Sequence, residues 1–397
     1  MRDEIVVNNP RVVGYSYLEG VKCEIKNKSD IKNKKQLLSQ SEFYVLKFDK
    51  LSSQACKLVK KNASLLYYKN SLPFFDYSSK LLYTTRGQIE RIAACDDTYQ
   101  FNKLILDSAE DTICNFKKEY FDVTYPYGKL HLGGKTRIMG ILNVAPDSFY
   151  DGKRFNTVES AIAHAHKMVE EGADIIDIGG ESTRPGAYPL SEAEEIKRVI
   201  PIIKILSKQI RKPISIDTYK AKVAEKAINA GVSIINDIGG LQMDKKMARV
   251  ASEAKVPVVI MHKKGIPRTM QRYTVRNNLL SEIISYLRKS ISIGIKAGID
   301  ESKIILDPGI GFGKTLQHNL EILKRLKEFK SLGFPILIGT SRKKFIGAIL
   351  KLPARERLVG TLATLAVASM NGAHIVRVHD VHEAVQIVTM CDAIRNN

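Results

Sequence analysis

Eight short apolar segments recur between residues 137 and 378, and each is followed by a longer, mostly polar segment. The apolar segments are RIMGIL (137–142), DIIDI (174–178), PISID (213–217), SIIN (233–236), PVVIM (257–261), KIILD (303–307), PILIG (335–339) and HIVRV (374–378). Runs of this kind are typical of buried parallel strands, because a strand covered on both faces has no polar side. Helical periodicity is clearest in VESAIAHAHKMVEEG (158–172), SEAEEIKRVIPIIKILSKQI (191–210), NLEILKRLKEFKSLG (319–333) and VHEAVQIVTMCDAIR (381–395).

Eight strand–helix repeats within residues 137–397 match the size and repeat number of a (β/α)8 TIM barrel. An open doubly wound sheet is the alternative fold, but it usually has fewer strands and a glycine-rich first turn. No GxGxxG pattern follows the first apolar segment. The predicted class is therefore α/β, with a TIM barrel formed by residues 133–397.

Residues 1–132 show no such repeat. They combine a lysine-rich stretch, KCEIKNKSDIKNKKQ (22–36), with short tyrosine-rich runs and two segments of helical spacing, 51–61 and 88–118. The turn-prone HLGGK at 131–135 marks a boundary. We expect a small α+β accessory domain here, which could cover a barrel end, form an oligomer interface or bind a partner.

The chain carries a net charge of +20, which indicates anionic partners: nucleic acid, acidic lipid or phosphorylated small molecules. The lysine-rich stretch has no interleaved aromatic residues, so we expect no nucleic acid. Apolar runs are too short to span a bilayer, and the first ten residues lack a signal-peptide core. Five scattered cysteines without a CxxC pair suggest neither a disulfide framework nor a zinc ribbon, which favours the cytoplasm.

Polar side chains follow the predicted strands at the ends where a barrel places its chemistry. A single aspartate or asparagine there is often only a helix cap, but recurrence at eight successive strand ends favours a functional site. The positions are Asn143, the segment 179–186, Asp217, Asn236, Met261, Asp307, Ser341, Lys343, Arg377 and His379.

These residues divide into two chemical sets. Asp217, Asn236, Asp307 and Lys343 offer acceptors and donors suited to a flat, nitrogen-rich heterocycle, because a carboxylate can accept two N–H groups from an aminopyrimidine edge. A cationic and hydroxylic set suits phosphate, and the last helix adds an N-terminus that favours an anion. This second set comprises Asn143, Thr183, Arg184, Arg377 and His379. Asn143 offers a neutral oxygen to a Mg²⁺ ion on a diphosphate.

At these positions the sequence resembles the dihydropteroate synthases, within the wider pterin-binding barrel family. The matching strings are MGILNVAPDSF (139–149), DIGGESTRPGA (177–187), SIDTYKAKVAEKA (215–227), INDIGG (235–240), MHKKGIPRTMQ (261–271), DPGIGFGKT (307–315), GTSRKKFIG (339–347) and RVHDV (377–381). The resemblance covers roughly residues 135–397. It implies condensation of a dihydropterin methyl diphosphate with 4-aminobenzoate, release of pyrophosphate, and a homodimer.

The resemblance also implies individual roles. The pterin set would be Asp217, Asn236, Met261, Asp307 and Lys343, and Asn143 would hold Mg²⁺. Thr183, Arg184, Arg377 and His379 would handle the diphosphate, while Pro185, Phe312, Ser341 and Lys343 would border the aminobenzoate pocket. Asp217, Asp307, Lys343, Arg377 and His379 are the catalytic candidates.

The departures from the family pattern are few. Ala145 stands where threonine is usual, so it removes a hydroxyl from the first loop. Lys263 and Ile266 replace the commoner methionine and threonine. Two rival functions remain: a methyl transfer from a methyl-tetrahydropterin to a corrinoid protein, which needs no diphosphate set, and a pterin-binding module without activity.

Overall fold

The computed structural model describes residues 108, 111–144, 157–182, 189–265 and 279–397, with the backbone of six short strands between residues 7 and 85. The expected site residues Thr183, Arg184 and Pro185, and the family departures Ala145 and Ile266, lie outside these ranges. The chain divides into two compact units. One contains residues 1–118 and 327–333, and the other contains 119–326 and 334–397.

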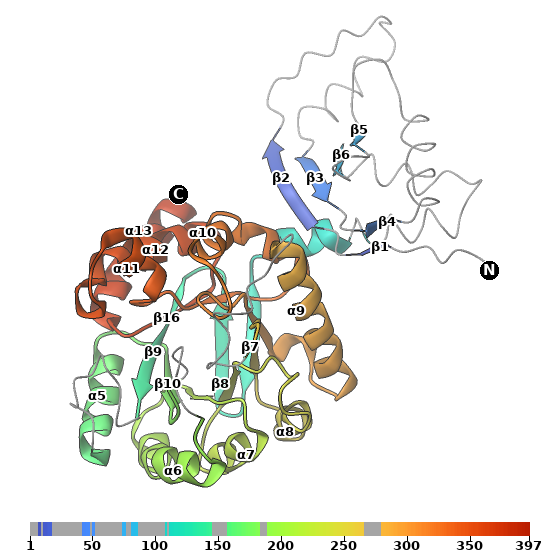
Figure 1. Ribbon diagram of the computed structural model, residues 1–397. Coiled ribbons are helices and arrows are strands. Elements are labelled where there is room, and N and C mark those ends of the chain that lie inside the picture. The colour runs from blue at the N-terminus through green and yellow to red at the C-terminus, as the bar shows by residue number, and fades with distance from the viewer. Residues whose placement is uncertain are drawn as a thin grey trace, which may run out of the picture. The chain divides into compact units, whose positions relative to one another are not determined.

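The first unit contains an antiparallel sheet, consistent with the expected α+β character of this region. Its strand order is β2-β3-β6-β5, and a separate pair joins β1 to β4 (Figure 1). The bounds are β1 Val7–Asn8, β2 Arg11–Tyr17, β3 Glu42–Lys47, β4 Lys50–Leu51, β5 Phe74–Asp76 and β6 Leu81–Thr85. Residues 111–117 are helical, within the expected segment 88–118.

The second unit is the predicted barrel. Eight parallel strands follow one another in the order β14-β13-β12-β11-β10-β9-β16-β15, and a parallel bridge between Leu306 and Ile336 closes the ring. Every strand falls within a predicted apolar segment or extends it by one residue. The bounds are β9 Arg137–Asn143, β10 Ile175–Gly179, β11 Ile214–Asp217, β12 Ile234–Asp237, β13 Val258–Met261, β14 Ile304–Asp307, β15 Leu337–Ile338 and β16 Ile375–Val378.

Helices surround the strands, as Figure 1 shows. Three of them begin at reciprocal capping boxes, in which Thr157, Ser191 and Thr315 each pair with the residue three positions on. The bounds are α5 Val158–Glu170, α6 Glu192–Gln209, α7 Ala221–Asn229, α8 Met247–Ala254, α9 Leu279–Lys296, α10 Leu316–Lys324, α11 Lys344–Leu350, α12 Leu358–Met370 and α13 Val381–Asn396. No helix in the described ranges is both long and apolar enough to cross a membrane.

One predicted helix is divided. The segment 319–333 is read from sequence as a single helix, but α10 ends at Lys324 and the 3₁₀ helix η4 (Leu326–Leu332) follows. Three buried side chains, Leu326, Phe329 and Leu332, are spaced three residues apart. A 3₁₀ helix has three residues per turn, so it places all three on one face, whereas an α-helix would rotate them apart.

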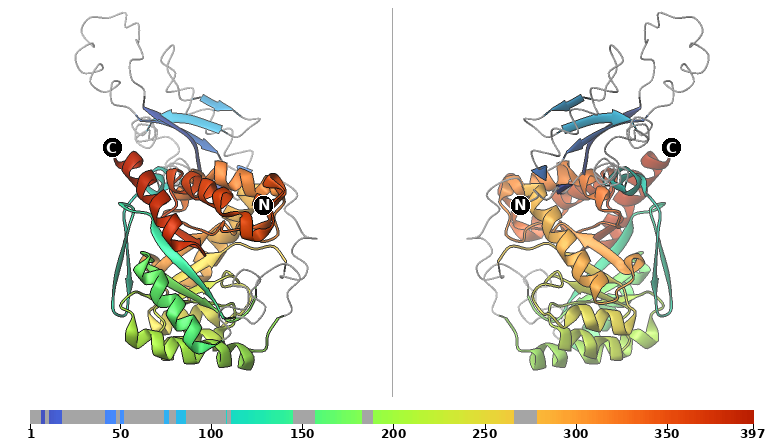
Figure 2. Two further views of the ribbon diagram at one scale, coloured as in Figure 1. Left: turned by 90° about the vertical axis from the view of Figure 1, so that its left-hand side faces the viewer. Right: turned by 90° about the vertical axis from the view of Figure 1, so that its right-hand side faces the viewer.

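A hairpin closes the amino-terminal end of the barrel. Its strands are β7 (Phe121–Tyr125) and β8 (Gly128–Leu132), paired antiparallel. Figure 2 shows this teal hairpin lying across one end of the barrel. Its buried side chains Val123, Leu130 and Leu132 form one apolar cluster with a residue from each of seven barrel strands. The strand residues are Met139, Ile175, Ile234, Val259, Ile305, Leu337 and Ile375. The opposite end of the strands carries the polar residues.

Candidate active site

The carboxyl ends of β10, β11, β12 and β16 meet around one buried aspartate, Asp177. Its Oδ2 accepts hydrogen bonds from Asn236 Nδ2 at 3.0 Å and from Arg377 Nε at 2.6 Å. Asp177 is completely buried. Asp177 is not among the site residues predicted from the sequence, although an aspartate inside an apolar strand segment is a recognisable signal, because charged side chains are rarely buried without a partner.

Arg377 joins two carboxylates. Its Nη2 donates to Asp217 Oδ2 at 2.6 Å, in addition to the bond to Asp177. Burial raises the pKa of Asp217 to about 7, although Arg377 opposes the shift. Arg377 was expected among the diphosphate residues, and the structure places its guanidinium against the carboxylates of the heterocycle set. It therefore lies where it can connect the two sets.

Several buried polar atoms in this region have no hydrogen-bond partner within the described part of the chain. They include Asp177 Oδ1, Asp217 Oδ1 and Ser215 Oγ. The register pairs Asp177 with Ser215 and Asp217 with Asn236 on neighbouring strands. A buried acceptor without a partner costs free energy, so this cluster is suited to a ligand or water that donates N–H or O–H groups.

On another part of the ring, the charges of Asp307 and Lys343 act on each other. Met261 and Asp307 are register partners on β13 and β14, and both are buried. Burial raises the pKa of Asp307, and Lys343 is the largest opposing influence. Burial lowers the pKa of Lys343 to about 8. Lys343 Nζ donates to the Ile310 carbonyl and lies 4.8 Å from the centroid of the Phe312 ring.

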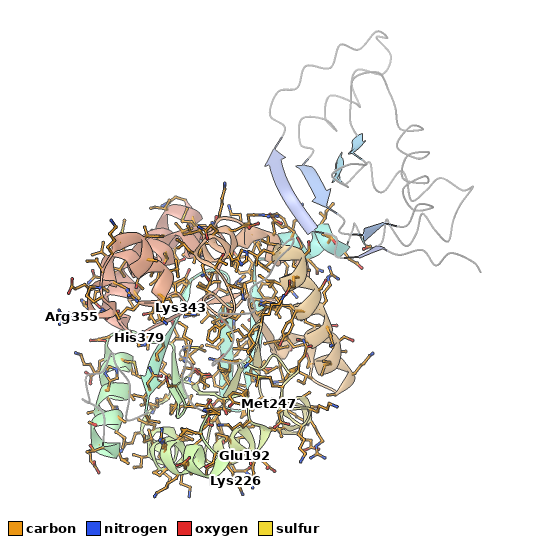
Figure 3. All side chains as sticks on the ribbon, viewed as in Figure 1. Glu192, Lys226, Met247, Lys343, Arg355 and His379 are labelled. Carbon is orange, nitrogen blue, oxygen red and sulfur yellow. The ribbon has the colours of Figure 1, made fainter. Side chains whose placement is uncertain are left out.

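The ends of β15 and β16 are tied together by Ser341 and His379. Ser341 Oγ lies 2.9 Å from His379 Nδ1 and accepts the His379 backbone N–H at 3.2 Å. Beneath them, the Arg342 guanidinium pairs with Asp380. Figure 3 labels Lys343 and His379, which come from the red part of the chain, before α11 and after β16. Hydroxyl and imidazole groups held in this way are suited to an anion.

Asn143, the expected metal ligand, is partly exposed at the end of β9. A Cβ placed on Gly179 would lie 3.6 Å from both Asn143 Oδ1 and the Asp217 Cβ, so Asn143 borders the carboxylate cluster. Across the described ranges, no group of three or more His, Cys, Asp or Glu side chains could hold a metal ion. One neutral amide oxygen fits an ion that receives most of its ligands from a substrate.

A buried ionic cluster outside the expected set includes Glu181, which follows β10. Lys220 Nζ donates to Glu181 and to Glu195, each at 2.5 Å, and Glu181 also accepts the Leu190 backbone N–H at 3.1 Å. Lys263, one of the family departures, is only 8% exposed, and its Nζ has no hydrogen bond among the described residues. These contacts join residues far apart in sequence, so spacing alone could not predict them.

A closed TIM barrel with buried carboxylates, an amide and cations at the carboxyl ends of its strands is the architecture of a barrel enzyme that binds a polar ring. Comparison with known proteins agrees. The pterin binding enzyme family matches residues 139–379. The chain belongs to that family and, within it, to the dihydropteroate synthases.

The relatives are similar over the barrel. A dihydropteroate synthase from Bacillus subtilis is 52% identical over 262 residues, which are 66% of this chain and 90% of that protein. A Yersinia pestis dihydropteroate synthase, solved with a sulfonamide drug complex, superposes with a TM-score of 0.68 at 40% identity, covering 70% of this chain and 100% of that one. A Xanthomonas albilineans dihydropteroate synthase, solved with 4-aminobenzoic acid, superposes with a TM-score of 0.63 at 39% identity, covering 68% of this chain and 96% of that one.

Proposed function

We propose that this protein condenses (7,8-dihydropterin-6-yl)methyl diphosphate with 4-aminobenzoate, giving 7,8-dihydropteroate and pyrophosphate. The observation that carries the proposal is the cluster at Asp177, Asp217 and Asn236, where buried acceptors stand without donors. The aminopyrimidine edge of a pterin supplies N–H donors to such acceptors. The similarity to dihydropteroate synthases over the whole barrel supports the same reaction.

The pterin would lie between the two halves of the ring. Asp217 and Asn236 would accept and donate along the aminopyrimidine edge, with Asp307 and Lys343 on the opposite side. Met261 would contribute apolar contact beside Asp307. Asp217 binds N–H donors best when ionised, and Arg377 favours that form.

The reaction replaces one bond by another at the pterin methylene carbon. The bond from this carbon to the diphosphate oxygen breaks, and the pair of electrons leaves with pyrophosphate. The 4-aminobenzoate nitrogen then supplies the pair for the new C–N bond and loses a proton to water. An aniline is unprotonated at neutral pH, so no side chain has to act as its base.

The residues would contribute by stabilising charge. Arg377 and His379, with Thr183 and Arg184 from the segment after β10, would stabilise the negative charge that develops on the leaving diphosphate. Asp217 and Asp307 would offset the positive charge on the pterin. Ser341 and Phe312 would border the aminobenzoate, with Pro185. Ser341 and His379 touch, but this reaction needs no covalent enzyme intermediate, so the pair is an anion-binding contact and not a nucleophile with its base.

Mg²⁺ is proposed to bind with the diphosphate, through Asn143. It would neutralise part of the charge on the phosphate oxygens. Binding of 4-aminobenzoate in the presence of pyrophosphate should then be lost when a chelator removes Mg²⁺. Persistence of that binding in excess chelator would remove the metal role from Asn143.

A homodimer is proposed through the last helices of the barrel. Three large apolar side chains on α12 and α13, Val359, Met390 and Ile394, are between 61% and 76% exposed. Apolar exposure of this kind on packed helices is typical of an interface. Light scattering should give a dimer mass, and Ile394→Lys should shift the protein toward the monomer.

The direct test is pyrophosphate release by the full chain. Release should require both the pterin diphosphate and 4-aminobenzoate, and dihydropteroate should form in equal amount. A corrinoid methyltransferase or an inactive pterin-binding module would release none. The cytoplasmic location, the boundary at residue 132 and the role of residues 1–132 stay predictions.

A further inference from the structure

Lys314 is a buried residue of the loop that joins β14 to α10, and it is not among the expected site residues. Its side chain is only 3% exposed. Lys314 Nζ donates to His262 Nδ1 at 2.9 Å and to the Phe312 carbonyl at 3.2 Å, and it lies 3.5 Å from the His262 carbonyl. A buried ammonium is costly unless it is paired with acceptors, so these contacts indicate a defined position for Lys314.

His262 is itself held in place. It is 1% exposed, and its backbone N–H donates to the Asp307 carbonyl at 2.9 Å. Its ring meets the Tyr286 ring edge-on, with centroids 4.9 Å apart, and Tyr286 Oη donates to the Gly239 carbonyl at 3.0 Å. The acceptor presented to Lys314 is therefore fixed by β13, α9 and the loop after β12.

The loop from 308 to 315 lies directly against the chain that follows β13. Gly309 has φ +73°, and a Cβ on it would collide with the His262 carbonyl oxygen. Gly313 has φ +67°, and a Cβ there would lie 2.5 Å from the Lys264 carbonyl oxygen. Two glycines allow this close approach, and Lys314 supplies the side-chain hydrogen bonds across it.

The same loop carries two groups that contact Lys343. The Ile310 carbonyl accepts a hydrogen bond from Lys343 Nζ, and the centroid of the Phe312 ring lies 4.8 Å from the same nitrogen. Because Lys314 holds the Phe312 carbonyl, it also limits where the Phe312 ring can lie. Phe312 is an expected wall of the aminobenzoate pocket.

We propose that Lys314, acting with His262, is a positioning residue for 4-aminobenzoate: it holds Phe312 in place beside Lys343. The inference rests on the proposed function. Two of the expected pterin residues, Asp217 and Asn236, are joined through Asp177 and Arg377 and not through the 308–315 loop. Asp307 is the pterin residue that this loop contacts, through the Gly309 N–H at 2.7 Å. Loss of Lys314 should therefore affect the two substrates unequally.

The test is Lys314→Met in the full chain, with KM measured separately for each substrate. We expect KM for 4-aminobenzoate to rise about tenfold, because misplacement of a positioning group by a fraction of an ångström has effects of this order. KM for the pterin diphosphate should change less than about threefold. Lys324→Met removes an exposed lysine from α10 and is the matched control, with both constants unchanged.

A purely structural role would raise both KM values by similar factors or lower only the yield of folded protein, and either result overturns the proposal, as does no change in either constant. If Lys314→Met does not fold, His262→Phe keeps a ring against Tyr286 and removes the acceptor. The same unequal effect is expected, and equal effects there would also overturn the positioning role. Turnover by the unsubstituted chain separates the two ideas: turnover without the unequal effect rejects only the role of Lys314, and no turnover rejects both.

Discussion

The two ends of the barrel are built from the same eight strands and have opposite chemistry. At the amino-terminal end, the β7–β8 hairpin buries Val123, Leu130 and Leu132 against apolar strand residues. At the carboxyl end, the interior contains carboxylates, an amide and cations. Strand β10 shows the change most sharply, because Ile175 belongs to the apolar cluster and Asp177, two residues on and on the same face, joins Asn236 to Arg377.

The difference indicates that one end of the barrel contributes mainly to stability and the other end mainly to function. Apolar burial at the closed end contributes free energy without specific partners. Burial at the open end raises the pKa of Asp217 and Asp307 and lowers that of Lys343, so charge there is disfavoured. Side-chain pKa values shifted in this way are typical of functional sites. Substitutions at the two ends should therefore separate activity from stability.

The largest expected effect is at the open end. Asp217→Asn should lower kcat/KM about 1000-fold, roughly 4 kcal/mol of transition-state stabilisation, because the amide cannot offer two acceptors to the pterin edge. The melting temperature should stay close to that of the unsubstituted chain, since Arg377 keeps its bond to Asp177. Steady-state kinetics and calorimetry measure the two quantities, and near-normal turnover would refute the role of Asp217 in the site.

The converse substitution is at the closed end. Leu132→Ala should lower the free energy of unfolding by about 3 kcal/mol, because it leaves a cavity in the cluster under the barrel. Well below the melting temperature, kcat per folded molecule should be unchanged. A denaturant titration measures the free energy of unfolding, and kinetics with active-site titration measures kcat per folded molecule. A matched fall in kcat would mean that the two ends are coupled.

The pH dependence of kcat/KM should reflect the open end alone. Asp217, with its pKa raised to about 7, loses charge as the pH falls below that value, so activity should fall on the acid side. Lys343, with its pKa lowered to about 8, loses charge above it, so activity should also fall on the alkaline side. Each limb should approach about a tenfold change per pH unit.

The control for the alkaline limb is Lys263→Met, because Lys263 also has its pKa lowered to about 8 by burial. Burial also lowers the pKa of Lys314, to about 7, so retention of the alkaline limb in both Lys263→Met and Lys314→Met assigns it to Lys343. A profile that is level from pH 6 to pH 9 would contradict both assignments.

The smallest expected effect is on stability, in the same Lys263→Met variant. A buried ammonium without a hydrogen bond among the described residues costs free energy, and a methionine of similar length does not. The free energy of unfolding should rise by about 1 kcal/mol, with activity within about threefold. A lower melting temperature would show that the attraction of Lys263 to Asp237 and Glu181 outweighs its burial.

Local sequence patterns predicted the strands because a strand buried on both faces needs a continuous apolar run, whatever surrounds it. They predicted Asp217, Asn236 and Asp307 for a related reason: a charged or amide group that ends such a run lies at the rim of the barrel. The division of the segment 319–333 was missed, since the spacing of Leu326, Phe329 and Leu332 is compatible with either kind of helix until their burial is known.

The sequence by itself determined the barrel, the end that carries the chemistry and the family, because periodicity and contiguous motifs are local properties of the chain. Only the tertiary structure decided which polar groups meet. Arg377 lies 200 residues from Asp177 and 160 from Asp217, and Lys314 lies 52 residues from His262. Contacts over such separations depend on closure of the ring, which brings strand ends together irrespective of their order in the sequence.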